Sequence, residues 1–150
     1  MEIDKIDFTK IDKIKPSISK DESQITIFSA DRLDGNKFQD FVAKLLESNG
    51  FTDVSVTGRT GDQGGDLLAK KDGEQLVIQA KRYSVDRKVT NSAVQEVIGA
   101  IPYYNANKGI VITNSFYTQS AKELAKVNKI ELWDRSMVTL MLDEYNQAQK

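Results

Sequence analysis

Two short, largely apolar segments, residues 66–71 and 74–81, are separated by Asp72-Gly73. Asp-Gly is among the residue pairs most typical of a two-residue β-hairpin turn, because both central positions of that turn favour left-handed backbone angles. The two segments are therefore predicted to be antiparallel strands. This hairpin is the strongest constraint that the sequence places on its fold.

The hairpin also predicts which side chains face each other. If Lys71 and Glu74 flank the turn, Asp66 lies opposite Gln79, with their Cβ atoms about 4.5–5.5 Å apart. Side chains alternate between the two faces of a strand, so Lys81 joins Gln79 on the same face. A β-bulge would shift this register. Without a bulge, a carboxylate, an amide and an ammonium group converge, which is typical of a metal-assisted phosphodiester site.

The composition narrows the chemistry that such a site can perform. The chain has 150 residues with no histidine and no cysteine. Ser-His-Asp and Cys-His catalysis, zinc sites of the usual ligand set and disulfide frameworks are therefore excluded. Carboxylates, amides and lysines remain, and they suit a hard cation such as Mg²⁺ together with a phosphate group.

Size and charge indicate one domain with, at most, a local surface for nucleic acid. The chain is 39% hydrophobic and has 21 basic against 22 acidic residues, so its net charge does not favour DNA. The segment 70–88 is the best candidate surface, because its basic residues outnumber its acidic ones. The simpler interpretation is a solvated hairpin and loop of mixed charge. No long apolar segment occurs, which predicts a cytoplasmic protein without a membrane anchor.

Hydrophobic periodicity predicts the remaining elements. Helices are expected over residues 34–49, 91–102, 117–128 and 134–147, and further strands over residues 51–57, 109–113 and 130–133. This order predicts an α/β fold with a mixed central β-sheet and helices on both faces. Residues 1–30 are expected to be an N-terminal arm that ends in an added edge strand near Ile25–Phe28. A small-molecule α/β enzyme is disfavoured, because no Gly-x-Gly-x-x-Gly or Walker-type loop is present.

Several motifs occur together and in order. They are Gly35-x-x-Phe38, Gly61-Asp62-x-Gly64-x-Asp66, Ile78-Gln79-Ala80-Lys81, Val94-Gln95-Glu96 and Gly109-Ile-Val-Ile-Thr113. With them, residues 33–142 resemble the catalytic domain of Mrr-type restriction endonucleases, in the PD-(D/E)xK nuclease superfamily. The resemblance implies a restriction-endonuclease-like core over residues 31–150. It also implies Mg²⁺-dependent hydrolysis of double-stranded DNA, with Mn²⁺ as an alternative cation, in restriction of or defence against foreign or modified DNA.

The resemblance assigns roles by matching positions. Asp66 matches the metal-binding aspartate, Gln79 takes the position of the second metal ligand, and Lys81 matches the lysine that orients water and offsets charge on the phosphate. The side chains expected around this site or against DNA are Gln39, Asp62, Arg82 and Gln95. Relatives often carry a separate DNA-reading domain, and cutting two strands usually needs two sites. A homodimer or a separate DNA-recognition subunit or domain is therefore an expected partner.

One departure from the family pattern concerns the first helix. Where many relatives have Phe-Glu, this chain has Phe38-Gln39, so an expected carboxylate is replaced by an amide. Asp62 and Glu96 are better substitutes than Asp40, which lies about 100° around the helix. A site with little negative charge binds Mg²⁺ weakly. The alternative hypothesis is therefore a catalytically weak or inactive DNA-binding module of the same fold.

Overall fold

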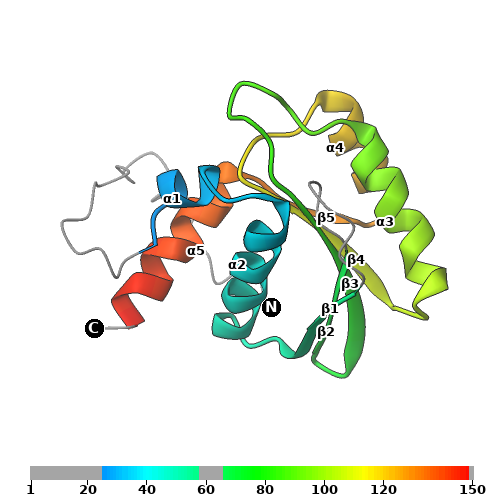
Figure 1. Ribbon diagram of the computed structural model, residues 1–150. Coiled ribbons are helices and arrows are strands. Elements are labelled where there is room, and N and C mark those ends of the chain that lie inside the picture. The colour runs from blue at the N-terminus through cyan, green and yellow to red at the C-terminus, as the bar shows by residue number, and fades with distance from the viewer. Residues whose placement is uncertain (1–24, 58–65, 149–150) are drawn as a thin grey trace.

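The computed structural model describes residues 25–57 and 66–148, which form a five-stranded sheet with helices on both faces (Figure 1). The elements in chain order are α1 Ile27–Asp31, α2 Gly35–Ser48, β1 Thr52–Val56, β2 Asp66–Lys71, β3 Glu74–Lys81, α3 Asn91–Tyr103, β4 Lys108–Thr113, α4 Gln119–Val127, β5 Glu131–Trp133 and α5 Arg135–Ala148. The predicted α/β architecture with a mixed central sheet is confirmed.

The strands are ordered β1-β2-β3-β4-β5, antiparallel from β1 to β3 and parallel from β3 to β5. The β2–β3 turn has φ angles of 53° at Asp72 and 78° at Gly73, as a type I′ turn requires. The pairing runs without a shift from Lys71 opposite Glu74 to Asp66 opposite Gln79. The predicted hairpin register is therefore confirmed, and no bulge displaces the candidate site.

The two faces of the sheet carry different helices. Ile78 and Ala80 of β3 belong to the core cluster that α2 and α5 cover, whereas Val77 belongs to the cluster covered by α3 and α4. Figure 1 shows α2 and α3 on opposite sides of the strands. Because side chains alternate along β3, Gln79 and Lys81 share the face of Val77. The candidate site therefore lies beneath α3.

The ends of the helices follow local sequence signals. The Asp34 side chain accepts a 2.8 Å hydrogen bond from the Lys37 backbone N–H and so caps α2, which satisfies one of the free donors at a helix start. Pro102 lies in the last turn of α3, which ends one residue later. A proline has no backbone N–H to donate within a helix, which is consistent with the end of α3 at this point.

The predicted edge strand near residues 25–28 is wrong, because Ile27–Asp31 forms the short helix α1. The Thr26 hydroxyl accepts from the Ser29 backbone N–H at 3.2 Å, and the helix buries Ile27 and Ala30 in the core. Their spacing of three residues suits one helical face, which the alternating isoleucines of the sequence concealed. Helix α1 also spans the predicted boundary between the arm and the domain at residue 30. Residues 1–24 lie outside the described part of the chain.

Candidate active site

Asp66, at the start of β2, and Gln79, near the end of β3, are joined by a side-chain hydrogen bond. The Gln79 amide Nε2 donates to Asp66 Oδ1 at 2.9 Å, as the hairpin register predicts. Gln79 is only 8% exposed, and its Oε1 has no hydrogen-bond partner within the described residues. A buried polar atom without a partner costs about 1–3 kcal/mol, so the Gln79 amide is incompletely satisfied in this orientation.

Lys81 lies two residues beyond Gln79 on the same face of β3. Its side chain is 9% exposed, and Nζ lies 3.0 Å from Glu96 Oε2 on α3. The backbone at this point is fixed from β4, because the Thr113 hydroxyl donates to the Lys81 carbonyl oxygen at 2.6 Å. A buried ammonium group requires a negative partner. Helix α3 therefore contributes a carboxylate to the site.

The environment of the Asp66 carboxylate opposes its ionised form. Burial raises the pKa of Asp66, and hydrogen bonds from the side chains of Gln79 and Tyr104 act in the opposite direction. Among charged neighbours, Glu96 raises the pKa and Lys81 lowers it. A carboxyl whose pKa is raised by burial beside specific charge partners is typical of functional sites. A cation beside Asp66 would stabilise the ionised carboxylate, which burial destabilises.

Tyr104 and Thr57 belong to the site, although the sequence analysis did not select them. The Tyr104 hydroxyl donates to Thr57 Oγ1 at 3.3 Å, and it also contacts the Asp66 carboxylate. Thr57 donates from its backbone N–H and its hydroxyl to the Asp66 carbonyl oxygen, at 2.9 and 2.8 Å. Only the placement of the end of α3 over the start of β2 brings Tyr104 there. No local motif in the sequence marks this contact.

Comparison with models of protein families shows the family to which this chain belongs. A family model described as restriction endonuclease, of the Mrr catalytic-domain type, matches residues 30–142. This chain belongs to that restriction endonuclease family. No curated protein matches its sequence. The resemblance predicted from the ordered motifs is therefore confirmed.

Solved structures with this restriction endonuclease fold include three informative neighbours. A protein of unknown function, AF1548, has a TM-score of 0.62 and 19% identity and covers 73% of this chain. The DNA modification-dependent restriction endonuclease AspBHI has a TM-score of 0.57 and 17% identity and covers 73% of this chain. MspJI restriction endonuclease in complex with a 27-mer oligonucleotide has a TM-score of 0.56 and 13% identity and covers 85% of this chain. The chain spans 65% of AF1548 but only 31% and 34% of the two endonucleases. At these identities the likeness establishes the fold.

Gln39, which the resemblance places where many relatives have a glutamate, lies on α2, the helix that covers the opposite face of the sheet. Its side chain is fully buried, and both of its amide atoms lack a hydrogen-bond partner among the described residues. The burial separates Gln39 from solvent, so this side chain offers no surface to DNA. It also adds no charge to the site.

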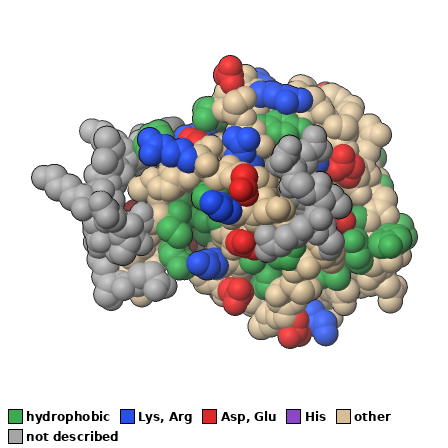
Figure 2. Space-filling view, viewed as in Figure 1, with side chains coloured by type: hydrophobic (Ala, Val, Ile, Leu, Met, Phe, Trp, Pro, Cys, Tyr) green, Lys and Arg blue, Asp and Glu red, His purple; other side chains and the backbone are tan. Residues whose placement is uncertain are grey.

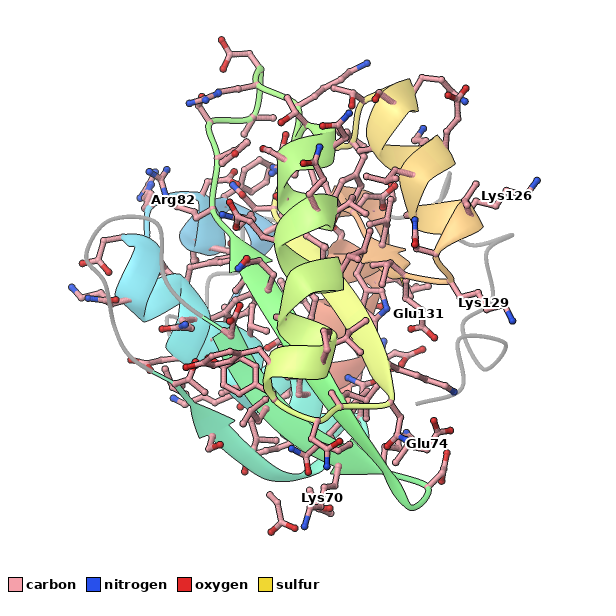
Figure 3. The ribbon with its side chains drawn as sticks, turned by 90° about the vertical axis from the view of Figure 1, so that its right-hand side faces the viewer. Lys70, Glu74, Arg82, Lys126, Lys129 and Glu131 are labelled. Atoms are coloured by element: carbon pink, nitrogen blue, oxygen red, sulfur yellow. The ribbon has the colours of Figure 1, made fainter. Side chains whose placement is uncertain are left out.

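The hydrogen bonds that Arg82 and Gln95, which were expected near the site or against DNA, make among the described residues do not involve Asp66, Gln79 or Lys81. Arg82 follows β3 and its guanidinium donates to the Asp31 carbonyl oxygen of α1 at 3.5 Å. Figure 3 shows Arg82 at the end of the hairpin remote from Lys70 and Glu74. Gln95 is exposed on α3 and donates to Asn91 at 3.0 Å. Asp62 lies outside the described residues. The structure thus brings together Asp66, Gln79 and Lys81 but not Gln39, Gln95 or Arg82.

The charge on the molecular surface is mixed. Figure 2 shows Lys and Arg side chains interspersed with Asp and Glu side chains over the visible face. Within the connection between β3 and α3, however, Arg87 and Lys88 are exposed, and the Arg87 guanidinium lies 4.8 Å from the Tyr83 ring. Arg87 and Lys88 follow Arg82 by five and six residues, and the exposed Asp86 precedes them. The connection between β3 and α3 is therefore locally basic although the chain as a whole is not.

The donor set of the site fits a magnesium ion. Asp66 offers a carboxylate and Gln79 an amide oxygen, with the Glu96 carboxylate nearby. Within residues 25–57 and 66–148, no three acidic, histidine or cysteine side chains gather as a metal cluster. Mg²⁺ commonly keeps several waters and takes only one or two protein carboxylates plus substrate phosphate. Asp66 and the buried Gln79 Oε1 are the groups that would hold it.

Within residues 25–57 and 66–148, no helix is long and apolar enough to span a bilayer.

Proposed function

We propose that this domain is a Mg²⁺-dependent endonuclease that hydrolyses phosphodiester bonds of double-stranded DNA, with Mn²⁺ as an alternative cation. Its biological role is restriction of, or defence against, foreign or modified DNA. The observation that carries the proposal is the buried Lys81 beside an Asp66–Gln79 pair whose amide oxygen is unpartnered. Membership of the restriction endonuclease family supports it.

The roles of the side chains follow from their charges and positions. Asp66 and Gln79 hold the cation. When bound, the cation supplies positive charge to the scissile phosphate and lowers the pKa of a water molecule. The Lys81 ammonium orients the attacking water and stabilises the negative charge that develops on the phosphate oxygens. Little water surrounds Lys81, so this charge acts more strongly than on an exposed surface.

The amide of Gln79 requires one rearrangement for this role. At present its Nε2 faces Asp66 and its Oε1 is buried without a partner. Rotation by about 180° about the last side-chain bond exchanges the two atoms and needs no change in the backbone, because this terminal torsion is broad and roughly two-fold. The amide oxygen then faces the same ion as the Asp66 carboxylate. The amide therefore satisfies Asp66 in one orientation and a cation in the other.

Recognition and double-strand cutting require more than this domain. The chain spans about a third of AspBHI and MspJI, at 31% and 34% of their lengths. We propose that DNA recognition resides in a separate domain or subunit and that a homodimer or larger complex supplies two sites for the two strands. Analytical ultracentrifugation with and without a DNA duplex would measure the assembly.

The experiment that tests the function is cleavage of supercoiled plasmid, carried out on unmodified and modified DNA. We expect nicked or linear product with Mg²⁺ or Mn²⁺ and none in EDTA. Product formed equally well in EDTA would contradict a metal-dependent mechanism. Preference for modified plasmid would assign the domain to modification-dependent restriction.

A second function, a DNA-binding module without catalysis, is favoured by the burial of Gln39 where the family carries an acid. Its signature is DNA affinity that falls with salt, with no product at any Mg²⁺ or Mn²⁺ concentration. Metal-dependent cleavage by the wild type separates the two functions. The variant Gln39→Glu then tests whether a carboxylate on α2 adds activity, with circular dichroism as the check on folding because position 39 is fully buried. A large gain in cleavage would show that missing negative charge limits the wild-type protein.

A further inference from the structure

Glu96 reaches the candidate active site from α3. Its carboxylate Oε2 lies 3.0 Å from Lys81 Nζ, and the two side chains differ in burial, with 51% of Glu96 and 9% of Lys81 exposed. The lysine is therefore fixed within the protein, whereas the glutamate lies at the solvent boundary with room to change its rotamer. Glu96 is the more mobile partner of this ion pair.

Glu96 also acts electrostatically on Asp66. Its negative charge adds to burial in raising the pKa of the Asp66 carboxyl, and Lys81 acts in the opposite direction. Two carboxylates and one ammonium therefore act on one another, with Lys81 buried, Asp66 partly buried and Glu96 at the solvent boundary. Their formal charges leave one negative charge unbalanced. An independent feature, the unpartnered Oε1 of the 8% exposed Gln79, lies on the same face.

We propose that Glu96 is the second carboxylate of the cation site and that it exchanges partners. Without a cation, Glu96 neutralises the buried Lys81. With a divalent cation held by Asp66 and Gln79, Glu96 turns to that cation and leaves the Lys81 ammonium free to face a phosphate. This inference rests on the cation binding in the proposed function. It assigns to α3 the negative charge that Gln39 on α2 does not supply.

The chemistry of the cation agrees with this exchange. Two carboxylates with an amide oxygen and water are a usual set for Mg²⁺, whereas one carboxylate alone binds it weakly. The doubly charged cation also attracts Glu96 more strongly than a singly charged ammonium does at a similar distance. Phosphate from the substrate then becomes the new partner of Lys81. The site thus remains close to electrically balanced in both states.

The test is calorimetric titration of the full chain with Mn²⁺ in the absence of DNA. Glu96→Gln is expected to weaken Mn²⁺ binding about tenfold or more. The matched control is Glu123→Gln on α4, an exposed glutamate on the neighbouring helix that accepts only a 3.4 Å contact from Gln119 among the described residues. This control is expected to bind Mn²⁺ as the wild type does.

A double-mutant cycle separates cation binding from a purely structural ion pair. Lys81→Met removes both the partner of Glu96 and a positive charge beside the cation site, so it should tighten Mn²⁺ binding in both backgrounds, and by clearly more when Glu96 is present than when Glu96 is replaced by Gln. The double variant removes both charges and leaves no buried ammonium unpaired, so it also serves if Glu96→Gln alone fails to fold. Equal effects of Lys81→Met in both backgrounds would overturn the inference.

The outcomes distinguish this inference from the proposed function. If Glu96→Gln binds Mn²⁺ as tightly as the wild type does, the proposed role of Glu96 is overturned, even if Mg²⁺-dependent cleavage is observed. No Mn²⁺ binding by the wild type overturns both the role and the metal-dependent mechanism. Glu96-dependent Mn²⁺ binding without cleavage supports the inference and contradicts only the endonuclease function.

Discussion

Two buried polar groups lie near the ends of neighbouring strands, and their hydrogen bonding differs. Beyond β4, fully buried Asn114 accepts from the Tyr83 backbone N–H at 2.9 Å and donates to the Tyr83 carbonyl and to Asp31 at 2.8 and 2.9 Å. Arg135 clamps the same Asp31 carboxylate with contacts of 2.8 and 3.0 Å. We call Asp31, Asn114 and Arg135 the Asn114 network. Both polar atoms of its central amide are satisfied.

The candidate active site, near the end of β3, is less complete. The Gln79 amide has one bonded and one unpartnered atom, and the Asp66 carboxylate is desolvated. Native proteins pair nearly all of their buried polar atoms, and exceptions mark strain or missing ligands. The comparison therefore separates an amide whose hydrogen bonds are complete from one whose oxygen has no partner among the described residues.

The two regions are connected through the backbone that follows β3. Thr113 and Ser115, on either side of Asn114, donate from their hydroxyls to the carbonyl oxygens of Lys81 and Arg87, each at 2.6 Å. Asn114 holds Tyr83 between them. The Asn114 network and its two neighbours thus fix the segment that begins with Lys81 and continues into the connection between β3 and α3. Rigid support of this kind is what a reactive site requires.

The largest effect is expected from removing the Lys81 ammonium. Lys81→Ala should reduce DNA cleavage by roughly 10²–10³-fold, because a charge aimed at the developing phosphate charge is lost. Circular dichroism should show a folded protein, since Glu96 is half exposed and can return to water. Lys108→Ala is the matched control, because Lys108 pairs with Glu74 at the opposite end of the sheet. Unchanged cleavage by Lys81→Ala would remove this lysine from the mechanism.

The Asn114 network should instead govern stability. Asn114→Ala deletes three hydrogen bonds and leaves the Tyr83 backbone groups and part of the Asp31 carboxylate without their partner. We expect the free energy of unfolding to fall by about 2–4 kcal/mol, measured by urea denaturation. Mn²⁺ affinity below the transition should change far less than in Asp66→Asn. If Asn114→Ala kept its stability but lost its affinity for Mn²⁺, the Asn114 network would serve metal binding and not the fold, contrary to this prediction.

Much of the fold could be predicted because its signals are local. The Asp72-Gly73 turn fixed the register that places Asp66 opposite Gln79, and apolar periodicity located four of the five helices. Helix α1 was missed because two isoleucines separated by one residue suit a strand as well as a short helix. Burial of Ile27 and Ala30 against the core decides between them, and burial depends on the assembled fold.

The site was predicted only where it depends on the hairpin. Asp66, Gln79 and Lys81 follow from strand alternation, which acts over a few residues. The contacts of Glu96 and Tyr104 depend on how α3 lies over β2 and β3, and sequence spacing does not determine that placement. The burial of Gln39 and the turn of Arg82 toward α1 likewise result from packing between distant segments.

A smaller effect should come from Gln39, whose fully buried amide has no partner within the described residues. Gln39→Met keeps a similar volume and removes the unsatisfied atoms, so it should raise the free energy of unfolding by about 1 kcal/mol. Gln95→Met on the exposed surface of α3 is the control and should change stability by about 0.5 kcal/mol or less. If Gln39→Met lowered the free energy of unfolding, the Gln39 amide would stabilise the fold, as the satisfied Asn114 amide does, and this prediction would be wrong.

The smallest effect is expected in the pH dependence of stability, measured in EDTA for wild type and Asp66→Asn. Burial raises the pKa of Asp66 in the fold. Between the usual carboxyl pKa and this raised pKa, the folded chain therefore retains a proton that the unfolded chain has lost. The contribution of Asp66 to wild-type stability therefore falls as pH rises through that window.

Asp66→Asn lacks this titration, so its melting temperature relative to wild type should increase across the same window and level off above it. Added Mn²⁺ should reverse the difference at neutral pH, because the cation binds the folded wild type and not the variant. A difference that stays constant with pH would show that Asp66 is stabilised as fully as the Asn114 network, and the proposed distinction between the two regions would then fail.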